Sequence, residues 1–216
     1  MKVLLIGDSI RLFYEEALKK ELGDAYQVYS PAENCRFAAY AANSLRFWFD
    51  DFPKPDIIHF NAGLWDTGIL FGENESFTPL DHYVFYMKRI LKTLQTTGAK
   101  IIFATTTPTD ENKRFESNPR FASQRNEIIE AYNQAVLEAF SGEDIVIDDL
   151  YAVINANKEG FISGDYIHPS KAGVNALAKA AAKCIRHVGK GLRPNSDDSA
   201  IPEKAPASAV NQKTLQ

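Results

Sequence analysis

Residues 1–10 are Met1-Lys2-Val3-Leu4-Leu5-Ile6-Gly7-Asp8-Ser9-Ile10, and this stretch decides the fold. The apolar run from Val3 to Ile6 is typical of a strand that is buried on both faces of a sheet. After Gly7 the apolar side chains recur at helical spacing, at Ile10, Phe13, Tyr14, Ala17 and Leu18. The sequence therefore predicts a strand that passes directly into a helix, with Ser9 at the carboxyl edge of the strand.

Two roles are open to Ser9 at this junction. Backbone N–H groups are unpaired at the start of a helix, and the helix dipole favours negative charge there, which suits a nucleophilic serine. Serine is more commonly an N-cap, whose hydroxyl accepts a hydrogen bond from the first turn. This stretch alone leaves both interpretations open.

The composition of the 216-residue chain is that of one domain, since 45% of its residues are hydrophobic and can form a sizeable core. The formal net charge of -4 predicts no basic surface for nucleic acid. No apolar run reaches the roughly 18 residues of a membrane span, so we expect no membrane partner. Gly7-Asp8 interrupts the first apolar run and no small-residue cleavage site follows, so we expect no signal peptide.

Cys35 and Cys184 are the only cysteines. Two isolated cysteines provide neither a disulfide framework nor a zinc pattern, and they favour reduced thiols in the cytoplasm. Cys35 is either a packed core residue or a reactive thiol near the site. No histidine pair has metal-ligand spacing, so no metal site is expected. His59 lies inside an apolar strand and is interpreted as a core residue.

Strand-like runs alternate with helical patterns along the chain. The predicted strands are 3–6, 25–29, 57–60, 100–104 and 145–147, and helical patterns follow each of them. Five strands joined through helices imply a parallel sheet covered on both faces, in the order 2-1-3-4-5. Residues 1–188 form the predicted domain, and the polar, aperiodic residues 189–216 are interpreted as a flexible tail.

A second informative stretch, Asp165-Tyr166-Ile167-His168-Pro169, precedes the last predicted helix. Acyl transfer from a serine needs a base that takes the hydroxyl proton and later returns it, which histidine does near neutral pH. An aspartate three residues earlier can hold one ring nitrogen and leave the other for Ser9. The alternative interpretation is that Asp165 tightens a turn and that His168-Pro169 begins a helix.

Together, Gly7-Asp8-Ser9 and Asp165-x-x-His168-Pro169 resemble blocks I and V of the SGNH (GDSL) hydrolase family, over residues 2–188. The resemblance implies a flavodoxin-like three-layer α/β/α fold and an ester hydrolase that needs no cofactor. It also implies that Ser9 is the nucleophile, His168 the general base and acid, and Asp165 its partner. A Gly-x-Ser-x-Gly elbow is absent because Arg11 stands at the second glycine position, which argues against the larger α/β-hydrolase fold.

The segments that supply the oxyanion hole in this family are altered. Asn34-Cys35-Arg36 stands where block II has its glycine, and Asn61-Ala62-Gly63-Leu64-Trp65-Asp66 forms block III, with Trp65 at the usual asparagine. We expect the backbone N–H groups of Ser9 and Cys35 and the side chain of Asn61 to bind the oxyanion. The alternative is that Asn61 only satisfies loop backbone. This block III also resembles that of PC-esterase-type members, which act on acylated glycans.

The expected substrate-binding residues are Asp8, Arg36, Gly63 and Trp65. The charge of Arg36 suits a substrate carboxylate or phosphate. Trp65, Phe71 and Phe77 either line an acyl or sugar pocket or pack in the core. Trp65 and its loop favour a small pocket, and therefore a short acyl group such as an O-acetyl group on a carbohydrate.

The predicted function is a serine esterase that hydrolyses a small-molecule or glycan ester through an acyl-enzyme. Two rivals remain open. A phosphate-ester hydrolase would recruit Arg36 and Asp66, and a non-catalytic module on the same fold would bind a ligand without reacting. Asp148-Asp149, at the end of the fifth predicted strand, is interpreted as the cap of the next helix.

Overall fold

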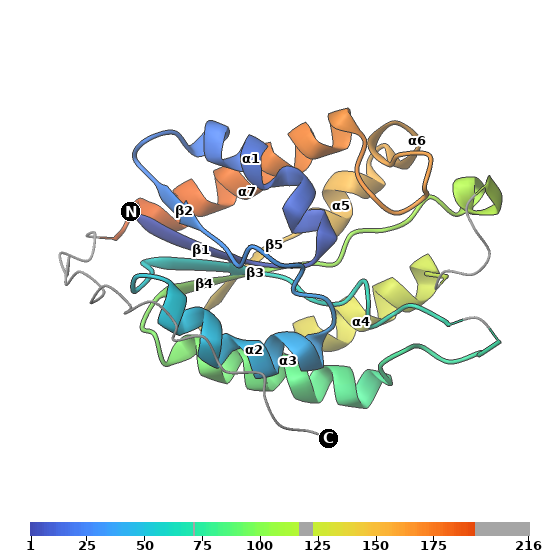
Figure 1. Ribbon diagram of the computed structural model, residues 1–216, viewed down its shortest axis with the longest axis horizontal. Helices are drawn as coiled ribbons and strands as arrows, with labels where there is room; N and C mark the ends of the chain where they lie inside the picture. The colour runs from blue at the N-terminus through green and yellow to red at the C-terminus, as the bar shows by residue number, and fades with distance from the viewer. Residues whose placement is uncertain (71, 117–122, 193–216) are drawn as a thin grey trace, which may run out of the picture.

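A computed structural model describes residues 1–70, 72–116 and 123–192 (Figure 1). Five parallel strands form the central sheet: β1 Lys2–Ile6, β2 Gln27–Tyr29, β3 Ile57–Phe60, β4 Lys100–Ala104 and β5 Ile145–Asp148. Their order is β2-β1-β3-β4-β5, as predicted. Because all the strands run in one direction, the loops that follow β1, β3 and β4 meet at the carboxyl edge of the sheet.

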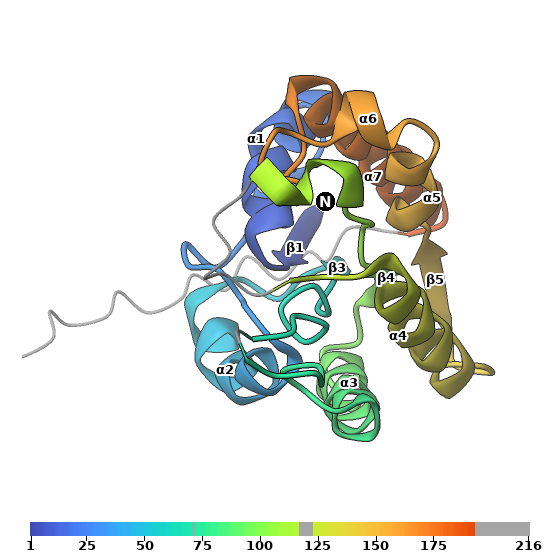
Figure 2. The ribbon, with the colours of Figure 1, turned by 90° about the vertical axis from the view of Figure 1, so that its right-hand side faces the viewer.

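Helices cover both faces of the sheet and give the three layers seen in Figures 1 and 2. One layer contains α1 and α7 with the short α5 and α6, and the other contains α2, α3 and α4. Their bounds are α1 Ser9–Leu22, α2 Ala38–Asp51, α3 Leu80–Gln95, α4 Asn126–Ala139, α5 Leu150–Asn155, α6 Lys158–Phe161 and α7 Lys171–Gly189. A 3-10 helix, η1, covers Glu111–Glu116. The predicted three-layer α/β/α fold is confirmed.

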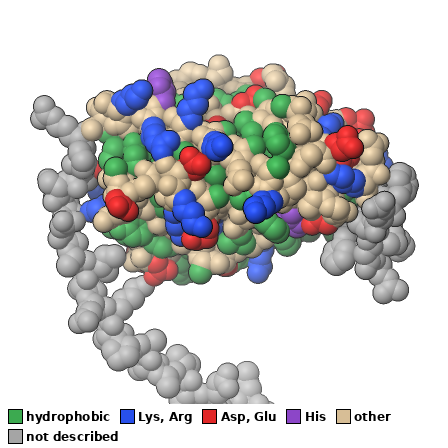
Figure 3. All heavy atoms as spheres, turned by 90° about the horizontal axis from the view of Figure 1, so that it is seen from above, with side chains coloured by type: hydrophobic (Ala, Val, Ile, Leu, Met, Phe, Trp, Pro, Cys, Tyr) green, Lys and Arg blue, Asp and Glu red, His purple; other side chains and the backbone are tan. Residues whose placement is uncertain are grey.

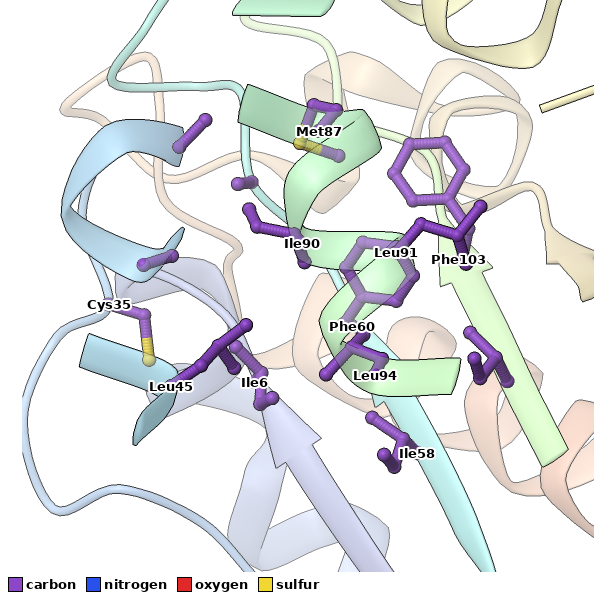
Figure 4. Close-up of a cluster of buried hydrophobic side chains, with 14 of the residues drawn as sticks. Ile6, Cys35, Leu45, Ile58, Phe60, Met87, Ile90, Leu91, Leu94 and Phe103 are labelled. Atoms are coloured by element: carbon purple, nitrogen blue, oxygen red, sulfur yellow. The ribbon is translucent and has the colours of Figure 1, made fainter. Parts of the chain in front are cut away.

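The strands are continuously apolar because helices bury both of their faces. Along β1, Leu4 and Ile6 belong to the core shared with α2 and α3, whereas Val3 and Leu5 belong to the core shared with α1 and α7. Figure 4 shows the first of these cores, where Phe60 of β3 and Phe103 of β4 lie against α3. Burying one such large apolar side chain contributes about 1.5–3 kcal/mol, so these two cores hold the three layers together.

Several local features differ from the sequence prediction. Strand β2 is shorter than predicted and begins at Gln27. Helix α6 is a single turn that the sequence analysis did not predict, and the side chain of Asn157 caps it. Neither α6 nor η1 is long enough to produce a helical period in the sequence. The expected tail 189–216 overlaps the last residue of α7, and its part from residue 193 lies outside the described residues.

The outer surface of the α1 and α7 layer is mixed in character. Figure 3 views the molecule from this side and shows lysine and arginine side chains among acidic and hydrophobic ones. Within the part of the chain that the structure describes, no helix combines the length and the apolar character needed to cross a membrane.

Candidate active site

Ser9 is held at the carboxyl edge of the sheet by the tight junction between β1 and α1. Gly7 permits this junction, because a Cβ at Gly7 would lie 2.7 Å from the Cβ of Arg11. Asp8 is the N-cap of α1, and its Oδ1 accepts a 2.9 Å hydrogen bond from the N–H of Ile10. Ser9 is therefore the first helical residue and not the cap, so the capping role that the sequence left open for its hydroxyl belongs to Asp8.

His168 and Asp165 lie on the loop between α6 and α7, which is closed by hydrogen bonds. The N–H of Ser163 donates to the carbonyl of His168 at 2.8 Å. Tyr166 has a left-handed backbone with a φ of 63°, and its buried hydroxyl donates to Gln124 Oε1 at 3.0 Å. These contacts fix the loop next to the start of α1.

Ser9, His168 and Asp165 form one hydrogen-bonded chain. His168 Nε2 lies 2.9 Å from Ser9 Oγ, and His168 Nδ1 lies 2.6 Å from Asp165 Oδ2. Asp165 Oδ1 accepts further hydrogen bonds from Ser163 Oγ at 2.7 Å and from the N–H groups of Ile167 and His168 at 3.1 and 2.9 Å. With Nδ1 protonated and donating to Asp165, Nε2 can accept the proton of the Ser9 hydroxyl.

Hydrogen bonding keeps Asp165 ionised. Partial burial raises the pKa of Asp165, but hydrogen bonds from Ser163, from the His168 ring and from two backbone N–H groups outweigh burial and lower the pKa to about 2. The carboxylate is therefore charged above about pH 3 and can hold the imidazole in one tautomer over that whole range.

Asp8 is buried beneath the site and does not present its carboxylate to a substrate, contrary to the sequence prediction. The residue is 1% exposed, and its Oδ2 has no hydrogen-bond partner among the described residues. Burial raises the pKa of Asp8 to about 6, against the lowering effects of the Ile10 N–H and of the charges on His168 and Arg11. Asp8 therefore caps α1 and adds a titratable group close to His168.

The predicted backbone donor at Cys35 is already used. Its N–H donates to the carbonyl of Gly7 at 3.2 Å, and its side chain lies in the core beside Leu45 (Figure 4). The sequence prediction for Cys35 as an oxyanion donor does not fit this geometry, because the loop after β2 is tied to Gly7. The N–H of Ser9, by contrast, has no backbone acceptor within residues 1–70, 72–116 and 123–192.

Arg36 is exposed at the loop that borders the β1–α1 junction. Its backbone is left-handed, with a φ of 52°, and its N–H donates to Asn34 Oδ1 at 2.8 Å. The guanidinium carbon lies 4.8 Å from the centroid of the Tyr40 ring, which is close enough for a cation–π contact. Arg36 thus remains a candidate for binding an anionic group of a substrate.

Asn61 follows β3, and its amide turns toward the neighbouring strand. Its Nδ2 donates to the carbonyl of Ala104 at 2.7 Å and lies 3.4 Å from Thr106 Oγ1. The second contact is long for a hydrogen bond, so one amide hydrogen is firmly held and the other is held weakly. Asn61 also lines a small hollow together with Ile10, the residue after Ser9.

Gly63 is buried against the loop that follows β4, and it offers no surface to a substrate, contrary to the sequence prediction. Its φ is 154°, and a Cβ there would lie 2.3 Å from Thr106 Oγ1 and 3.0 Å from Tyr83 Oη. The Tyr83 hydroxyl in turn donates to the carbonyl of Ala62 at 2.7 Å. The glycine is therefore required by backbone conformation and by close packing.

Asp66 caps α2 and is not available to a substrate. Its two carboxylate oxygens accept hydrogen bonds from the N–H of Ala38 at 3.2 and 3.0 Å, and the residue is 0% exposed. Burial raises the pKa of Asp66 to about 7, against the lowering effects of hydrogen bonds from Thr78 and Ala38. This burial argues against a phosphate-ester hydrolase that recruits Asp66.

We expect Asp66→Asn to remove the contribution of Asp66 to the change of the free energy of unfolding with pH. The pKa of Asp66 is about 7 in the folded protein against an ordinary value of 3.8. Protonated Asp66 therefore stabilises the wild type below about pH 4, and this stability is lost as the pH rises through about 7. The loss is about 4 kcal/mol, at 1.36 kcal/mol per pKa unit.

Urea denaturation from pH 4 to pH 8 measures this effect. Asp66→Asn should gain stability relative to the wild type as the pH rises, whereas the exposed control Asp81→Asn should follow the wild type. A difference between Asp66→Asn and the wild type that stays constant over this range contradicts the assignment.

Aromatic side chains border the loop that follows β3. Trp65 and Phe77 are each 44% exposed, and the Phe77 ring lies 5.1 Å, centroid to centroid, from that of Phe37. Phe71 lies outside the described residues. Trp65 is thus on the surface and not in the core, so it remains a candidate for the wall of a substrate pocket.

His59 is a core residue, as predicted, with a partner that the sequence did not identify. Its Nε2 lies 2.9 Å from Asp148 Oδ2, and both residues are buried. Asp149, and not Asp148, caps α5, because Asp149 Oδ1 accepts a 3.1 Å hydrogen bond from the N–H of Ala152. The predicted capping role is confirmed for Asp149 and wrong for Asp148, which instead joins β5 to β3 across β4.

Phe13 is the neighbour of the site that sequence reasoning missed, because it was placed on the buried face of α1. It is 49% exposed, and its ring stacks on His168 with the centroids 4.8 Å apart and the planes at 25°. Phe13 follows Ser9 by four residues, so the two lie on one helix face. That spacing is the signal that could have identified it.

Within residues 1–70, 72–116 and 123–192, no group of three or more histidine, cysteine, aspartate or glutamate residues is arranged to hold a metal ion. Cys35 and Cys184 are free and belong to different cores on opposite faces of the sheet.

The sequence matches no family model and no curated protein. Solved structures do share its fold. The acetyl xylan esterase AlAXEase has a TM-score of 0.64 at 17% identity and covers 86% of this chain and 100% of its own. A GDSL-like lipase from Bacteroides thetaiotaomicron has a TM-score of 0.63 at 16% identity, covering 88% of this chain and 89% of its own.

A lipase/acylhydrolase from Enterococcus faecalis has a TM-score of 0.64 at 17% identity and covers 86% of this chain and 95% of its own. These similarities extend over most of each chain. The chain therefore has the fold of the SGNH (GDSL) hydrolases.

Proposed function

We propose that this chain, which has the SGNH hydrolase fold, is a serine esterase whose catalytic residues are Ser9, His168 and Asp165. The observation that carries the proposal is the hydrogen-bonded chain from Ser9 Oγ to His168 Nε2 at 2.9 Å and from His168 Nδ1 to Asp165 Oδ2 at 2.6 Å. A second observation supports the proposal. Asp8 caps α1, so the Ser9 hydroxyl is not needed to cap the helix.

In the proposed reaction, Ser9 Oγ attacks the ester carbonyl carbon while His168 Nε2 takes the hydroxyl proton. Asp165 stabilises the imidazolium that forms, through the hydrogen bond at Nδ1. The tetrahedral intermediate collapses, His168 returns the proton to the departing alcohol oxygen, and an acyl-Ser9 ester remains. Water, deprotonated by His168, then attacks this ester and releases the carboxylic acid and free Ser9. No cofactor takes part.

We propose that the oxyanion is bound by the N–H of Ser9 and by the Nδ2 group of Asn61. The N–H of Ser9 stands at the start of α1, where the helix dipole favours negative charge. The second amide hydrogen of Asn61 is held weakly, because Nδ2 lies 3.4 Å from Thr106 Oγ1, and it can be donated to an oxyanion instead. Cys35, whose N–H is bonded to Gly7, is not included.

Asn61→Ala should lower kcat on an activated acetate ester by about 10²- to 10³-fold, as expected for the loss of one oxyanion donor. The KM should change little, because the donor acts on charge that develops after binding. Urea denaturation of the same variant reports the cost of losing the hydrogen bond to Ala104. If kcat per folded molecule equals that of the wild type while stability falls, Asn61 is only a structural residue of the loop.

We propose a short acyl group as the substrate's acid part, with an O-acetyl group on a carbohydrate as the leading candidate. Exposed Trp65 beside the loop after β3 suits a sugar ring, and Arg36 suits an anionic substituent on it. The similarity of the fold to an acetyl xylan esterase and the PC-esterase-like residues 61–66 support the same class. A panel of p-nitrophenyl esters from acetyl to decanoyl, together with acetylated xylan, tests it. Fastest hydrolysis of the long acyl esters contradicts it.

We propose that residues 1–188 carry this activity and that the protein is cytoplasmic. The two free cysteines lie in separate cores and cannot pair, which suits a reducing compartment. The proposed partner is a small-molecule or glycan ester.

A fluorophosphonate probe separates the esterase from its rivals. It should label the folded wild-type protein at Ser9, and no label should appear on Ser9→Ala. Folded protein that takes up no probe and binds an ester without cleaving it is a binding module. Hydrolysis of p-nitrophenyl phosphate, with no reaction toward p-nitrophenyl acetate, would instead establish a phosphate-ester hydrolase.

A further inference from the structure

The ring of Phe13 covers one face of the His168 imidazole. Phe13 lies on α1, four residues after Ser9, and its centroid is 4.8 Å from that of His168, with the ring planes at 25°. Phe13 is 49% exposed, so burial in the core of the helix layer does not explain the position of its ring. Its principal aromatic contact among the described residues is therefore the imidazole itself.

The two hydrogen bonds of His168 leave one motion of the ring unrestrained. Nδ1 and Nε2 are bonded to Asp165 and Ser9. Hydrogen bonds of ring nitrogens are directed along the plane of the ring. In-plane hydrogen bonds fix the ring's rotation within that plane but resist tilting out of it only weakly. A stacked aromatic ring opposes that tilt, because tilting breaks its dispersion contacts over the whole face.

We infer that Phe13 is a positioning residue that holds the His168 ring in plane between Ser9 and Asp165 and that stabilises the imidazolium formed during catalysis. The inference rests on the proposed function. The face of an aromatic ring is negative and attracts a cation stacked on it. Phe13 therefore favours the charged form of His168 over the neutral one, at the moment when Nε2 takes the serine proton.

Two carboxylates also act on this imidazolium. Asp165 contacts Nδ1 directly, and the buried carboxylate of Asp8, itself close to Arg11, lies near enough to His168 to interact through its charge. These groups are unchanged when Phe13 is replaced, so variants at Phe13 isolate the effect of the ring.

Three variants separate packing from the aromatic face. Phe13→Ala removes both, Phe13→Leu keeps most of the packing, and Phe13→Tyr keeps the stacked ring. We expect Phe13→Ala to lower kcat by about 10-fold on p-nitrophenyl acetate with KM within about twofold, since a misplaced base slows chemistry and not binding. Phe13→Tyr should retain the wild-type kcat. Leu12→Ala, at the neighbouring exposed position of α1, is the matched control and should also match the wild type.

The pH dependence tests the electrostatic part. Loss of the aromatic face in Phe13→Leu should move the acid limb of the kcat/KM profile about half a unit to lower pH, whereas Phe13→Tyr should leave it in place. Packing alone would not distinguish Phe13→Leu from Phe13→Tyr. Thermal melting of each variant confirms that the compared molecules are folded.

An NMR titration of the His168 ring protons provides a readout that needs no ester hydrolysis. Ring-current shifts should be present in the wild type and in Phe13→Tyr and absent in Phe13→Leu, and the Phe13→Leu midpoint should be the lower one. If the wild type cleaves no ester, the proposed function fails, and this titration still decides whether Phe13 favours the imidazolium. Equal midpoints in Phe13→Leu and Phe13→Tyr, or a wild-type kcat in Phe13→Ala, overturn the inference.

Discussion

Ser9→Ala is expected to lower kcat on p-nitrophenyl acetate by about 10⁴- to 10⁶-fold, the loss seen when the nucleophile of a hydrogen-bonded triad is removed. Alanine has no oxygen to form the acyl-enzyme, so His168 and Asp165 keep their geometry but have no serine proton to move. The residual rate comes from substrate binding and from the oxyanion donors alone.

The fold of Ser9→Ala should be unaffected, which makes the activity loss interpretable. Asp8 and not Ser9 caps α1, so the substitution removes only the hydrogen bond to His168 Nε2 and costs about 1 kcal/mol or less. Ser141→Ala, at an exposed serine after α4, is the control and should keep full activity. A Ser9→Ala protein with more than a tenth of wild-type kcat would mean that hydrolysis proceeds without this nucleophile.

Asp165→Asn is expected to lower kcat by about 10⁴-fold, because an amide in this position no longer fixes the tautomer of the histidine. The carboxylate accepts the Nδ1 hydrogen of His168 at 2.6 Å and so leaves Nε2 unprotonated for Ser9. An asparagine can turn its NH₂ group toward Nδ1, so that Nδ1 accepts a hydrogen bond and the ring proton is on Nε2. A protonated Nε2 cannot accept the proton of the Ser9 hydroxyl.

The pH profile gives this second prediction an independent test. Hydrogen bonds hold the pKa of Asp165 at about 2, so its protonation cannot cause a loss of activity at weakly acidic pH. Asp165→Asn should therefore lower kcat on the plateau of the profile, and it should also move the acid limb to lower pH because the imidazolium loses its carboxylate partner. Asp24→Asn, at an exposed carboxylate just after the carboxyl end of α1, is the control. An Asp165→Asn variant within tenfold of the wild type would remove Asp165 from the mechanism.

The strands were predictable because each strand sequence carries its own signal, and their order followed from the rules for parallel sheets joined through helices. Most residues of Ile57–Phe60 and Lys100–Ala104 are apolar, which is typical of a strand covered on both faces. Short elements were not predictable, because a one-turn helix such as α6 is too brief for its period to appear.

The candidate site was predictable where one motif contains both the residue and its local geometry. The three-residue spacing of Asp165 and His168 sets the contact at Nδ1, and the strand-to-helix junction sets the place of Ser9. Prediction failed where a residue's availability depends on a distant partner. Cys35 donates its N–H to the carbonyl of Gly7, and Asp66 accepts hydrogen bonds from the N–H of Ala38 at the start of α2. No local sequence pattern indicates either pairing.

The sequence by itself determined the alternation of strands and helices, the helix that follows Ser9 and the chemical types at the two ends of the chain, because these depend on local periodicity and short motifs. The tertiary structure alone decided that Asp8 and Gly63 are buried, that His59 pairs with Asp148 and that Phe13 stacks on His168. The physical reason is that burial, hydrogen-bond pairing and stacking are relations between segments, fixed only when the layers close around the sheet.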